Sequence, residues 1–245
     1  MNVTYITALY NIYNTPKASD RLSRDVQDLL RQKLQLIVYV DDFYEDVLRS
    51  IPDKSGTVTI INLPIEEVFI YSLIIQHRDS LQLPFNRNNE KDTFEYMALM
   101  NSKIEFLSQA IPLVHTPYVA WIDAGISKML FDKENSFDRL KNANVIGVNK
   151  ILIPGCYTRN ILSEDLCKSV WWVFLGTFFI CKTDFVEDFY TLSLRSVTYF
   201  YTKGYAVWEV NIWADMWNKY PEFFEWYYSD HNDGLTKFPG KFIIS

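Results

Sequence analysis

The sequence predicts an α/β fold in which a mainly parallel central sheet is flanked by helices. Short apolar runs typical of buried strands alternate with stretches whose apolar residues recur at helical spacing. This alternation is regular through the first half of the chain, which is typical of parallel strands joined by crossover helices. A chain of 245 residues with 49% apolar and 16% aromatic residues can bury a large core. No internal repeat and no linker rich in Pro, Gly or Ser divides it, so we expect residues 1–245 to form a single domain.

The first half is expected to contain four buried strands separated by helices. The expected strands cover residues 3–10, 34–40, 57–61 and 118–122, and the expected helices cover residues 20–33, 43–49, 65–77 and 93–111. Asp20 is a good N-cap for the first of these helices, and Leu22, Val26 and Leu29 share one of its faces. Residues 79–93 are polar and contain Pro84, so this segment is expected to be an exposed loop.

The second half predicts a smaller, mixed part. Strands are expected at residues 145–148 and 173–181, and residues 150–165 are expected to be irregular, with a turn at Pro154 and Gly155. A long helix is expected over residues 184–202, where Lys203 and Gly204 end it. After an extended segment at 205–207, a further helix is expected over residues 209–219, and Pro221 ends it.

Charge and cysteine content exclude several classes of protein. The formal net charge of −6 and the absence of any Lys/Arg block argue against a nucleic-acid-binding protein. Three cysteines without close paired spacing argue against a disulfide framework and a zinc ribbon, so a reducing, cytoplasmic location is expected. The N-terminus lacks the basic region and cleavage site of a signal peptide. The longest apolar stretch, 170–181, is shorter than the roughly twenty residues of a membrane helix, which leaves only peripheral membrane contact open.

The segment Tyr118-Val-Ala-Trp-Ile-Asp-Ala-Gly-Ile126 is the strongest indication of a functional site. A buried strand here delivers Asp123 to the carboxyl edge of the sheet, and Gly125 allows a phosphate-sized group to approach the backbone. Such a site suits a nucleotide diphosphate, held directly or through a divalent cation bound by oxygen ligands. A strand that ends in an ordinary Asp-Gly turn is the competing interpretation.

Two residues of the preceding helix are candidates for the same site. Asn101 and Lys103 lie on opposite flanks of the apolar face expected for that helix. From its flank, Lys103 could reach a phosphate or a sugar hydroxyl near the end of the Asp123 strand. The alternative is a solvated lysine on the helix surface.

Three residues of the second half could face a ligand. Glu209 stands at an expected helix start, where the helix dipole favours an acid, and it could act as general base toward an acceptor hydroxyl or bind that hydroxyl. Trp172 could stack on a sugar ring. His231 lies in the polar cluster Asp230-His-Asn-Asp-Gly234 and could offer a neutral imidazole to a metal. Ordinary helix capping, core packing and an exposed turn are the respective alternatives.

Several of these segments together resemble a known family. The segments Thr7-Ala-Leu-Tyr-Asn-Ile12, Met100-Asn-Ser-Lys103 and Tyr118 to Ile126 look like the HtrL/YibB (WlaTC-like) family of glycosyltransferases. The later tract Gly176-Thr-Phe-Phe-Ile-Cys-Lys182 and the tract from Gly204 to Trp213 are similar to the second half of glycosyltransferases of the GT-A fold. The resemblance covers most of the chain, and its most distinctive part is the Trp-Ile-Asp-Ala-Gly segment.

The resemblance implies a GT-A-like domain that transfers a sugar from a UDP- or GDP-linked donor to a glycan or lipid-linked acceptor, as in polysaccharide biosynthesis. Residues 1–126 would form the nucleotide-binding half and residues 127–245 the acceptor-side half. Asp123 would occupy the first position of the Asp-X-Asp motif of the fold, and Gly125 stands at its third position, where an acid is expected. One carboxylate gives a weaker site for Mn²⁺ or Mg²⁺, unless His231 and the phosphates of the donor complete it.

The resemblance also implies a role for each candidate residue. Asp123 and Glu209 would be catalytic, and Asp123 and His231 would bind the metal. The residues expected to contact substrate are Thr7, Ala8, Leu9, Tyr10, Asn101, Lys103, Trp121, Gly125, Trp172, Gly176 and Trp208. If Glu209 lies behind the anomeric carbon, the reaction inverts configuration, and otherwise a retaining route is open.

Two other classes of function stay open from the sequence. A Rossmann-type nucleotide-dependent enzyme would explain Asp41 and Asp42 as ribose-binding acids, but the turn after the first strand, Tyr10 to Pro16, lacks the glycines that such enzymes need. A non-catalytic carbohydrate-binding or scaffold protein of the same fold would explain the missing second acid of the motif.

Overall fold

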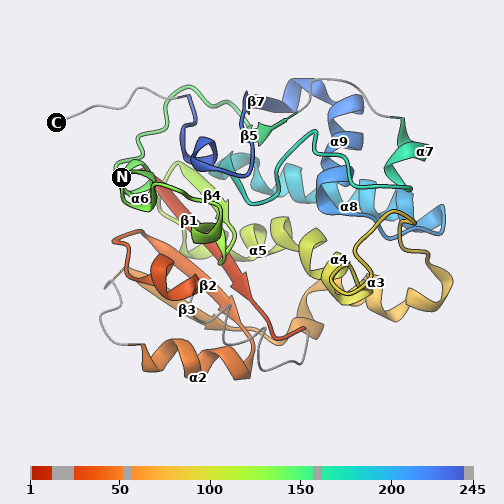
Figure 1. Ribbon diagram of the computed structural model, residues 1–245, viewed down its shortest axis with the longest axis horizontal. Helices are drawn as coiled ribbons and strands as arrows, with labels where there is room; N and C mark the ends of the chain where they lie inside the picture. Colours follow the sequence, from red (N-terminus) through yellow and green to blue (C-terminus); the bar gives the residue numbers. More distant parts are fainter. Residues whose placement is uncertain (1, 13–24, 52–56, 157–161, 240–245) are drawn as a thin grey trace.

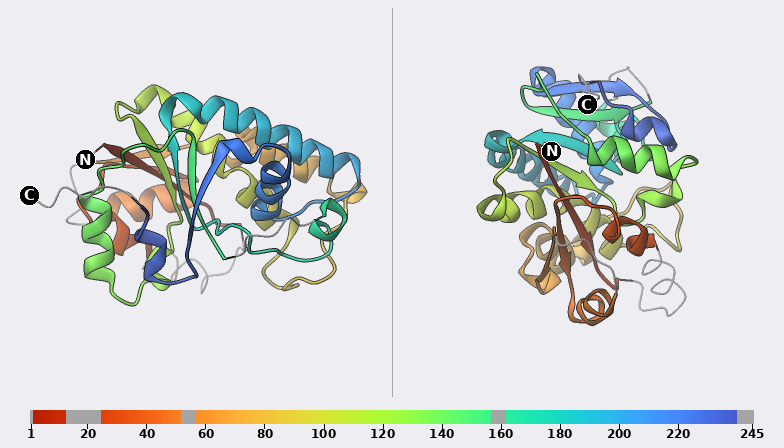
Figure 2. Two further views of the ribbon diagram at one scale, coloured as in Figure 1. Left: turned by 90° about the horizontal axis from the view of Figure 1, so that it is seen from above. Right: turned by 90° about the vertical axis from the view of Figure 1, so that its left-hand side faces the viewer.

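The computed structural model describes residues 2–12, 25–51, 57–156 and 162–239. Its centre is a seven-stranded mixed sheet with the strand order β3-β2-β1-β4-β6-β5-β7 (Figure 1). Strands β1 to β4 run parallel to one another, β6 is antiparallel to both β4 and β5, and β7 is parallel to β5. Helices cover both faces of the sheet (Figure 2). The predicted fold class, a mainly parallel sheet flanked by helices with a mixed second half, is confirmed.

The helices and strands follow the chain in this order. The strands are β1 (Val3–Leu9), β2 (Leu36–Val40), β3 (Val58–Asn62), β4 (Tyr118–Ile122), β5 (Ile151–Gly155), β6 (Phe178–Lys182) and β7 (Phe224–Tyr228). Residues 25–30 are helical, and the further helices are α2 (Asp42–Ser50), α3 (Phe69–Gln76), α4 (Phe94–Asn101), α5 (Lys103–Ala110), α6 (Lys133–Lys141), α7 (Ser163–Leu166), α8 (Val186–Thr202) and α9 (Glu209–Lys219). Short 3-10 turns cover Ile65–Glu67, Arg78–Ser80, Ile111–Leu113, Ile126–Lys128, Thr183–Phe185, Pro221–Phe223 and Asp233–Thr236.

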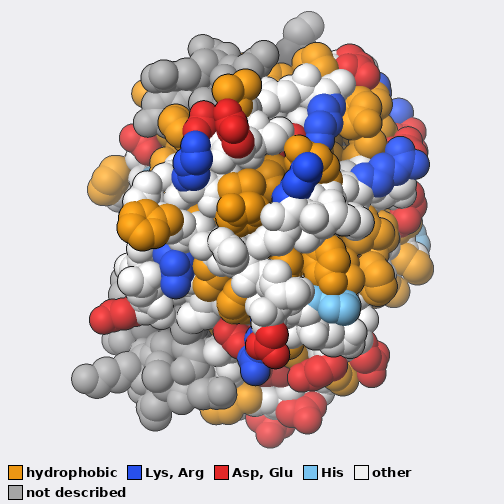
Figure 3. Space-filling model, turned by 90° about the vertical axis from the view of Figure 1, so that its right-hand side faces the viewer, with side chains coloured by type: hydrophobic (Ala, Val, Ile, Leu, Met, Phe, Trp, Pro, Cys, Tyr) orange, Lys and Arg blue, Asp and Glu red, His pale blue; other side chains and the backbone are white. Residues whose placement is uncertain are grey.

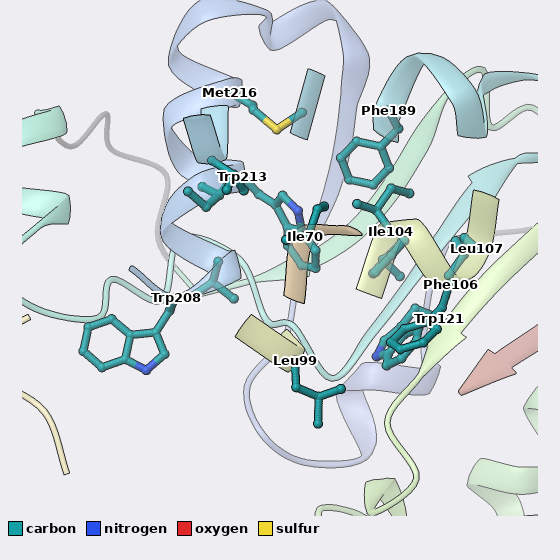
Figure 4. Close-up of a cluster of buried hydrophobic side chains, with 14 of the residues drawn as sticks. Ile70, Leu99, Ile104, Phe106, Leu107, Trp121, Phe189, Trp208, Trp213 and Met216 are labelled. Carbon is teal, nitrogen blue, oxygen red and sulfur yellow. The ribbon is translucent and has the colours of Figure 1, made fainter. Parts of the chain in front are cut away.

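The sheet separates two clusters of buried apolar side chains. Side chains alternate across a strand, so Tyr5 and Ile6 of β1 belong to opposite clusters. The larger cluster lies between the sheet and helices α3, α4, α5, α8 and α9, and the smaller one lies between the sheet, residues 25–30, α2 and α6. In the larger cluster Phe106 of α5 stacks on Trp121 of β4, with ring centroids 6.2 Å apart (Figure 4). The candidate site described below lies against this cluster.

Helix α5 also supports the start of α3. The carboxylate of Glu105, which is buried, accepts hydrogen bonds from the backbone N–H groups of Phe69 at 2.6 Å and Ile70 at 2.8 Å. These are two of the unpaired donors that every helix start leaves. Glu105 therefore caps α3 from a distant part of the chain.

The second half departs from the sequence prediction in two places. Residues 145–148 form no strand, and the strand lies instead at Ile151–Gly155, within the segment predicted to be irregular. Pro154 has no N–H to donate, but β6 pairs with β5 only at Ile151 and Leu152, so no ladder on that side requires one. The strand predicted at 173–181 is shorter, and covers Phe178–Lys182.

In the first half, the helix predicted at 93–111 is two helices that meet at Ser102. The Ser102 hydroxyl donates to the carbonyl of Ala98 at 2.8 Å, which is the local bond by which serine competes with regular helix geometry. For the predicted helix 20–33, residues 25–30 are helical, while Asp20 and Leu22 lie outside the described residues.

Within the described part of the chain, no helix combines the length and the apolar character needed to cross a membrane. The thiols of Cys156, Cys167 and Cys181 are all free, and burial raises the pKa of the Cys181 thiol well above its ordinary value.

Candidate active site

A cavity of about 260 Å³ opens at the carboxyl ends of β1 and β4. The two strands are parallel neighbours, so the residues that follow each of them meet at the same edge of the sheet. The described lining residues are Ala8, Leu9, Tyr10, Ile12, Lys91, Tyr96, Leu99, Met100, Trp121, Asp123, Ala124, Gly125, Lys128, Met129 and Thr177. Apolar walls with a few charged groups are typical of a small-molecule site.

Asp123 is held at this cavity from two sides. Its Oδ1 accepts a hydrogen bond from the Trp121 indole Nε1 at 2.6 Å and lies 3.0 Å from the Lys103 Nζ. Trp121 can reach it because residues two apart on a strand point to the same face. The Asp123 backbone N–H donates to the Thr177 carbonyl at 2.9 Å. About a third of the carboxylate side chain, 31%, is exposed, so it is accessible from the cavity.

Lys103 lies beneath Asp123, where its side chain is only 1% exposed. Its Nζ is 2.9 Å from Glu209 Oε1 and 2.8 Å from the Gly176 carbonyl, in addition to Asp123. Burial favours the neutral amine, but the charges of Asp123 and Glu209 outweigh it and raise the pKa of Lys103 above its ordinary value. Lys103 is therefore a charged ammonium at neutral pH, and it lies between two carboxylates.

Glu209 begins α9, and its side chain is 8% exposed. A β-carbon added at Gly176 would overlap Glu209 Oε1 and lie 3.2 Å from Lys103 Nζ. The absence of a side chain at Gly176 thus allows the carboxylate and the ammonium to meet against the backbone. Glu209 does not line the cavity, and it reaches the site through Lys103.

The structure brings nine of the fourteen expected site residues together. Those that line the cavity are Ala8, Leu9, Tyr10, Trp121, Asp123 and Gly125, and Lys103, Gly176 and Glu209 lie directly beneath it. The backbone at Gly125 begins a 3-10 turn, Ile126–Lys128, which turns the chain around the cavity mouth.

Three other expected residues are buried in the core. The Thr7 side chain is fully buried in β1 and does not line the cavity. Asn101 donates to the carbonyls of Met97 and Val207, both at 2.8 Å, and so joins α4 to the segment before α9. Trp208 packs within the larger cluster (Figure 4).

Trp172 and His231 form a separate contact. Their rings meet edge to face with centroids 4.9 Å apart, and His231 Nδ1 lies 3.3 Å from Asp230 Oδ1. Neither residue lines the cavity, so the structure does not bring His231 and Asp123 together in it.

Two lysines that the sequence analysis did not select line the cavity. Lys128 forms an ion pair with Asp25 at 2.6 Å, and Lys91 lies over the ring of Tyr96 with its Nζ 4.6 Å from the centroid. Lys128 follows shortly after Asp123 in the sequence, and this closeness is a local signal that could have pointed to Lys128. Lys91 comes from the polar loop before α4, and only the folded chain reveals its position.

The described residues fit a resident divalent cation poorly. Across the ranges that the structure describes, no three His, Cys, Asp or Glu side chains gather as a metal site. Asp123 is the one acid among the described residues that line the cavity, and its Oδ1 is already engaged by Lys103 and Trp121. Hard divalent cations take about six oxygen ligands or more, so nearly all of them would have to come from a ligand and water.

A second hollow, of about 450 Å³, adjoins the cavity at the ends of β2 and β3 and shares Tyr10 and Ile12 with it. Its other lining residues are Asn11, Asp41, Asp42, Phe43, Asn62, Pro64, Ile65, Glu66, Tyr71 and Glu95. Asp41 is already occupied, because it caps α2 through Tyr44 N–H at 2.9 Å and accepts from Asn11 N–H at 2.8 Å. The hollow is strongly acidic, in contrast to the lysine-lined cavity beside it.

A third hollow, of about 600 Å³, shares no lining residue with the other two. It lies between residues 82–87 and the end of α8 and includes Phe85, Arg87, Tyr199 and Lys203. Figure 3 shows that apolar and basic side chains lie side by side on this end of the molecule.

Comparisons with known proteins give similarity in structure only. No family model and no curated protein matches the chain. The structure is similar to mouse xyloside xylosyltransferase 1 in its apo form, with 10% identity, 93% of this chain and 85% of that chain covered, and a TM-score of 0.48. It is similar to core-mannan synthase A of Aspergillus fumigatus in a Mn/GDP form, with 12% identity, 93% and 73% covered, and a TM-score of 0.47. A third similar structure is HddC from Yersinia pseudotuberculosis, with 11% identity, 77% and 80% covered, and a TM-score of 0.36.

Proposed function

We propose that this chain is a glycosyltransferase that moves a sugar from a nucleotide-sugar donor to a glycan or lipid-linked acceptor. The observation that carries the proposal is the accessible carboxylate of Asp123 at the carboxyl edge of the sheet, fixed by a buried, charged lysine. In open α/β sheets this edge is where nucleotide ligands bind. The Trp-Ile-Asp-Ala-Gly segment that resembles the HtrL/YibB family contributes four residues to the cavity wall, Trp121, Asp123, Ala124 and Gly125.

The donor has a natural path across the two adjoining hollows. The diphosphate would lie in the cavity near Gly125, beside the ammonium of Lys128. The nucleoside would cross Tyr10 toward the acidic hollow, where a carboxylate such as that of Glu66 can accept hydrogen bonds from ribose hydroxyls. UDP and GDP are the nucleotides we propose.

Asp123 has a separate role in this proposal. With Oδ1 held by Lys103 and Trp121, its remaining oxygen can orient a hydroxyl of the transferred sugar. The geometry favours a positioning role for Glu209, because its carboxylate holds Lys103, which in turn holds Asp123. For Glu209 to remove the acceptor proton as general base, it would first have to leave Lys103.

The acidic hollow also bears on the Rossmann-type alternative. A ribose-binding acid after β2 would need free oxygens, and both oxygens of Asp41 are occupied by backbone N–H groups. Asp42 accepts from the Asn62 side chain at 2.7 Å. The scaffold alternative predicts that no nucleotide binds at all.

The experiment that tests the proposal is calorimetric titration with UDP-, GDP- and CMP-sugars, followed by measurement of nucleotide diphosphate release with candidate acceptors. We expect one nucleotide class to bind and its sugar to be transferred. Asp123→Asn should bind the nucleotide but release little diphosphate. If none of these nucleotide sugars binds to a protein that unfolds cooperatively, the result would favour the scaffold and overturn the proposal.

We further propose that the protein works in the cytoplasm, with peripheral contact to a membrane if its acceptor is lipid-linked, and that it binds no nucleic acid. The net charge of −6 supports the last point, because phosphate backbones require clustered cations.

A further inference from the structure

The place of the missing acid of the Asp-X-Asp motif is occupied by a positive charge. Gly125 stands at the third position of that motif, and its φ of −94° is accessible to any residue. A β-carbon added there would lie 3.2 Å from Lys128 Nζ, and its three nearest neighbouring atoms would all belong to the Lys128 side chain. The ammonium of Lys128 therefore fills the space into which a second carboxylate would project.

The remaining charged side chains of the described cavity wall, Lys91 and Lys128, are both positive. The one lining acid among the described residues, Asp123, is paired with the buried ammonium of Lys103 at 3.0 Å. Lys91 also lines the cavity, where it lies against Tyr96. Lys128 is balanced by Asp25, which does not line the cavity. The described cavity wall thus carries two lysines and one acid, while the acids Glu209 and Asp25, which pair with Lys103 and Lys128, lie outside it.

This arrangement is unfavourable for a divalent cation and favourable for a polyanion. A dication near Asp123 would be repelled by the ammonium groups of Lys103 and Lys128 and would find one partly engaged carboxylate as its protein ligand. A diphosphate at the same place would gain charge-assisted hydrogen bonds from flexible lysine ends, without the cost of removing water from a metal ion.

We propose that Lys128 and Lys91 bind the diphosphate of the donor directly and that this binding requires no divalent cation. The proposal rests on the proposed glycosyltransferase function for the identity of the donor. In the transfer, the bond between the anomeric carbon and the phosphate oxygen breaks, and its electron pair stays on that oxygen. The acceptor oxygen forms the new bond and gives its proton to a base or to water. Lys128 and Lys91 stabilise the charge that develops on the departing diphosphate.

The test uses inorganic pyrophosphate as probe, titrated into the full chain in the presence of EDTA. We expect binding in EDTA, and a loss of about tenfold or more in affinity in Lys128→Gln, because a charge-assisted phosphate contact is removed. Lys91→Gln, at an exposed side chain, should weaken binding independently. Lys203→Gln is the matched control, because it removes the same charge from a different hollow and should leave the affinity unchanged.

A second readout follows the metal alone. Paramagnetic resonance of Mn²⁺ should show no protein-bound signal in the native chain without nucleotide. Pyrophosphate binding that requires Mn²⁺, tight Mn²⁺ binding by the protein alone, or an unchanged affinity in both Lys128→Gln and Lys91→Gln would overturn the proposal. Thermal unfolding of each variant separates loss of binding from loss of fold.

The two proposals fail separately. If pyrophosphate binds through Lys128 while no nucleotide sugar yields product, the glycosyltransferase assignment fails and the lysine site stands. If nucleotide sugars are turned over only with Mn²⁺ and Lys128→Gln has no effect, the lysine site fails and the enzyme assignment stands.

Discussion

Replacing Gly176 by alanine tests the packing beneath the candidate site. The new β-carbon would overlap Glu209 Oε1 and lie 3.1 Å from its Cδ and 3.2 Å from Lys103 Nζ. Both partners are almost fully buried, so neither can swing into solvent. The change should therefore separate the carboxylate from the ammonium.

The magnitude follows from two costs. Forcing an extra carbon into a well-packed interior costs about 1–3 kcal/mol, and breaking a buried ion pair costs about 3–5 kcal/mol. Partial relaxation makes these costs less than additive, so we expect the free energy of unfolding to fall by about 3 kcal/mol. For a chain of this size that corresponds to a fall in Tm of about 6–12 °C.

Urea unfolding followed by tryptophan fluorescence would measure the loss, and titration with the bound nucleotide would measure the effect on the site. Gly125→Ala is the matched control for stability, because its β-carbon meets only the end of the Lys128 side chain. We expect that control to change the free energy of unfolding by less than about 0.5 kcal/mol. If Gly176→Ala is equally mild, the described contact between Gly176, Glu209 and Lys103 does not stabilise the protein.

Three further predictions concern carboxylates. Asp123→Asn should abolish turnover while the protein stays folded, because Lys103 keeps its contacts with Glu209 and the Gly176 carbonyl; full activity would remove Asp123 from the mechanism. Glu209→Gln should lower kcat more than it raises the Kd of the donor, and an unchanged pH profile of kcat would mark a positioning role, whereas loss of its acidic limb would mark a general base. Burial raises the pKa of Glu105, although the N–H groups of Ile70 and Phe69 oppose this, so the native state holds its proton more tightly than the unfolded state does. The free energy of unfolding should therefore fall as pH rises from below 4.5 through the raised pKa, and this slope should disappear in Glu105→Gln.

The positions of the first four strands along the chain could be predicted because each is a local pattern. Asp123 and Gly125 follow directly after β4, and that short-range signal was sufficient to place Asp123 at the sheet edge. The β5 segment could not be predicted, because Pro154 and Gly155 are turn residues by propensity and are tolerated in a strand only through its particular partners.

The electrostatic environment of the site could not be predicted from the sequence, for a different reason. Spacing alone placed Lys103 on a helix flank, which is compatible with solvent or with burial. Its burial follows from three acceptors that belong to distant segments, at Asp123, Gly176 and Glu209. Lys91 likewise reaches the cavity only through the path of a loop.

The contacts of Lys103 with these three acceptors also bear on how the candidate site forms during folding. Gly176 and Glu209 are separated from Lys103 by 73 and 106 residues along the chain. Contacts between such distant segments close late in folding, because ordering the intervening chain costs entropy first. A nucleotide added during refolding should accordingly be captured only in the slowest phase, and a fragment that stops after β4 should form strands without acquiring affinity.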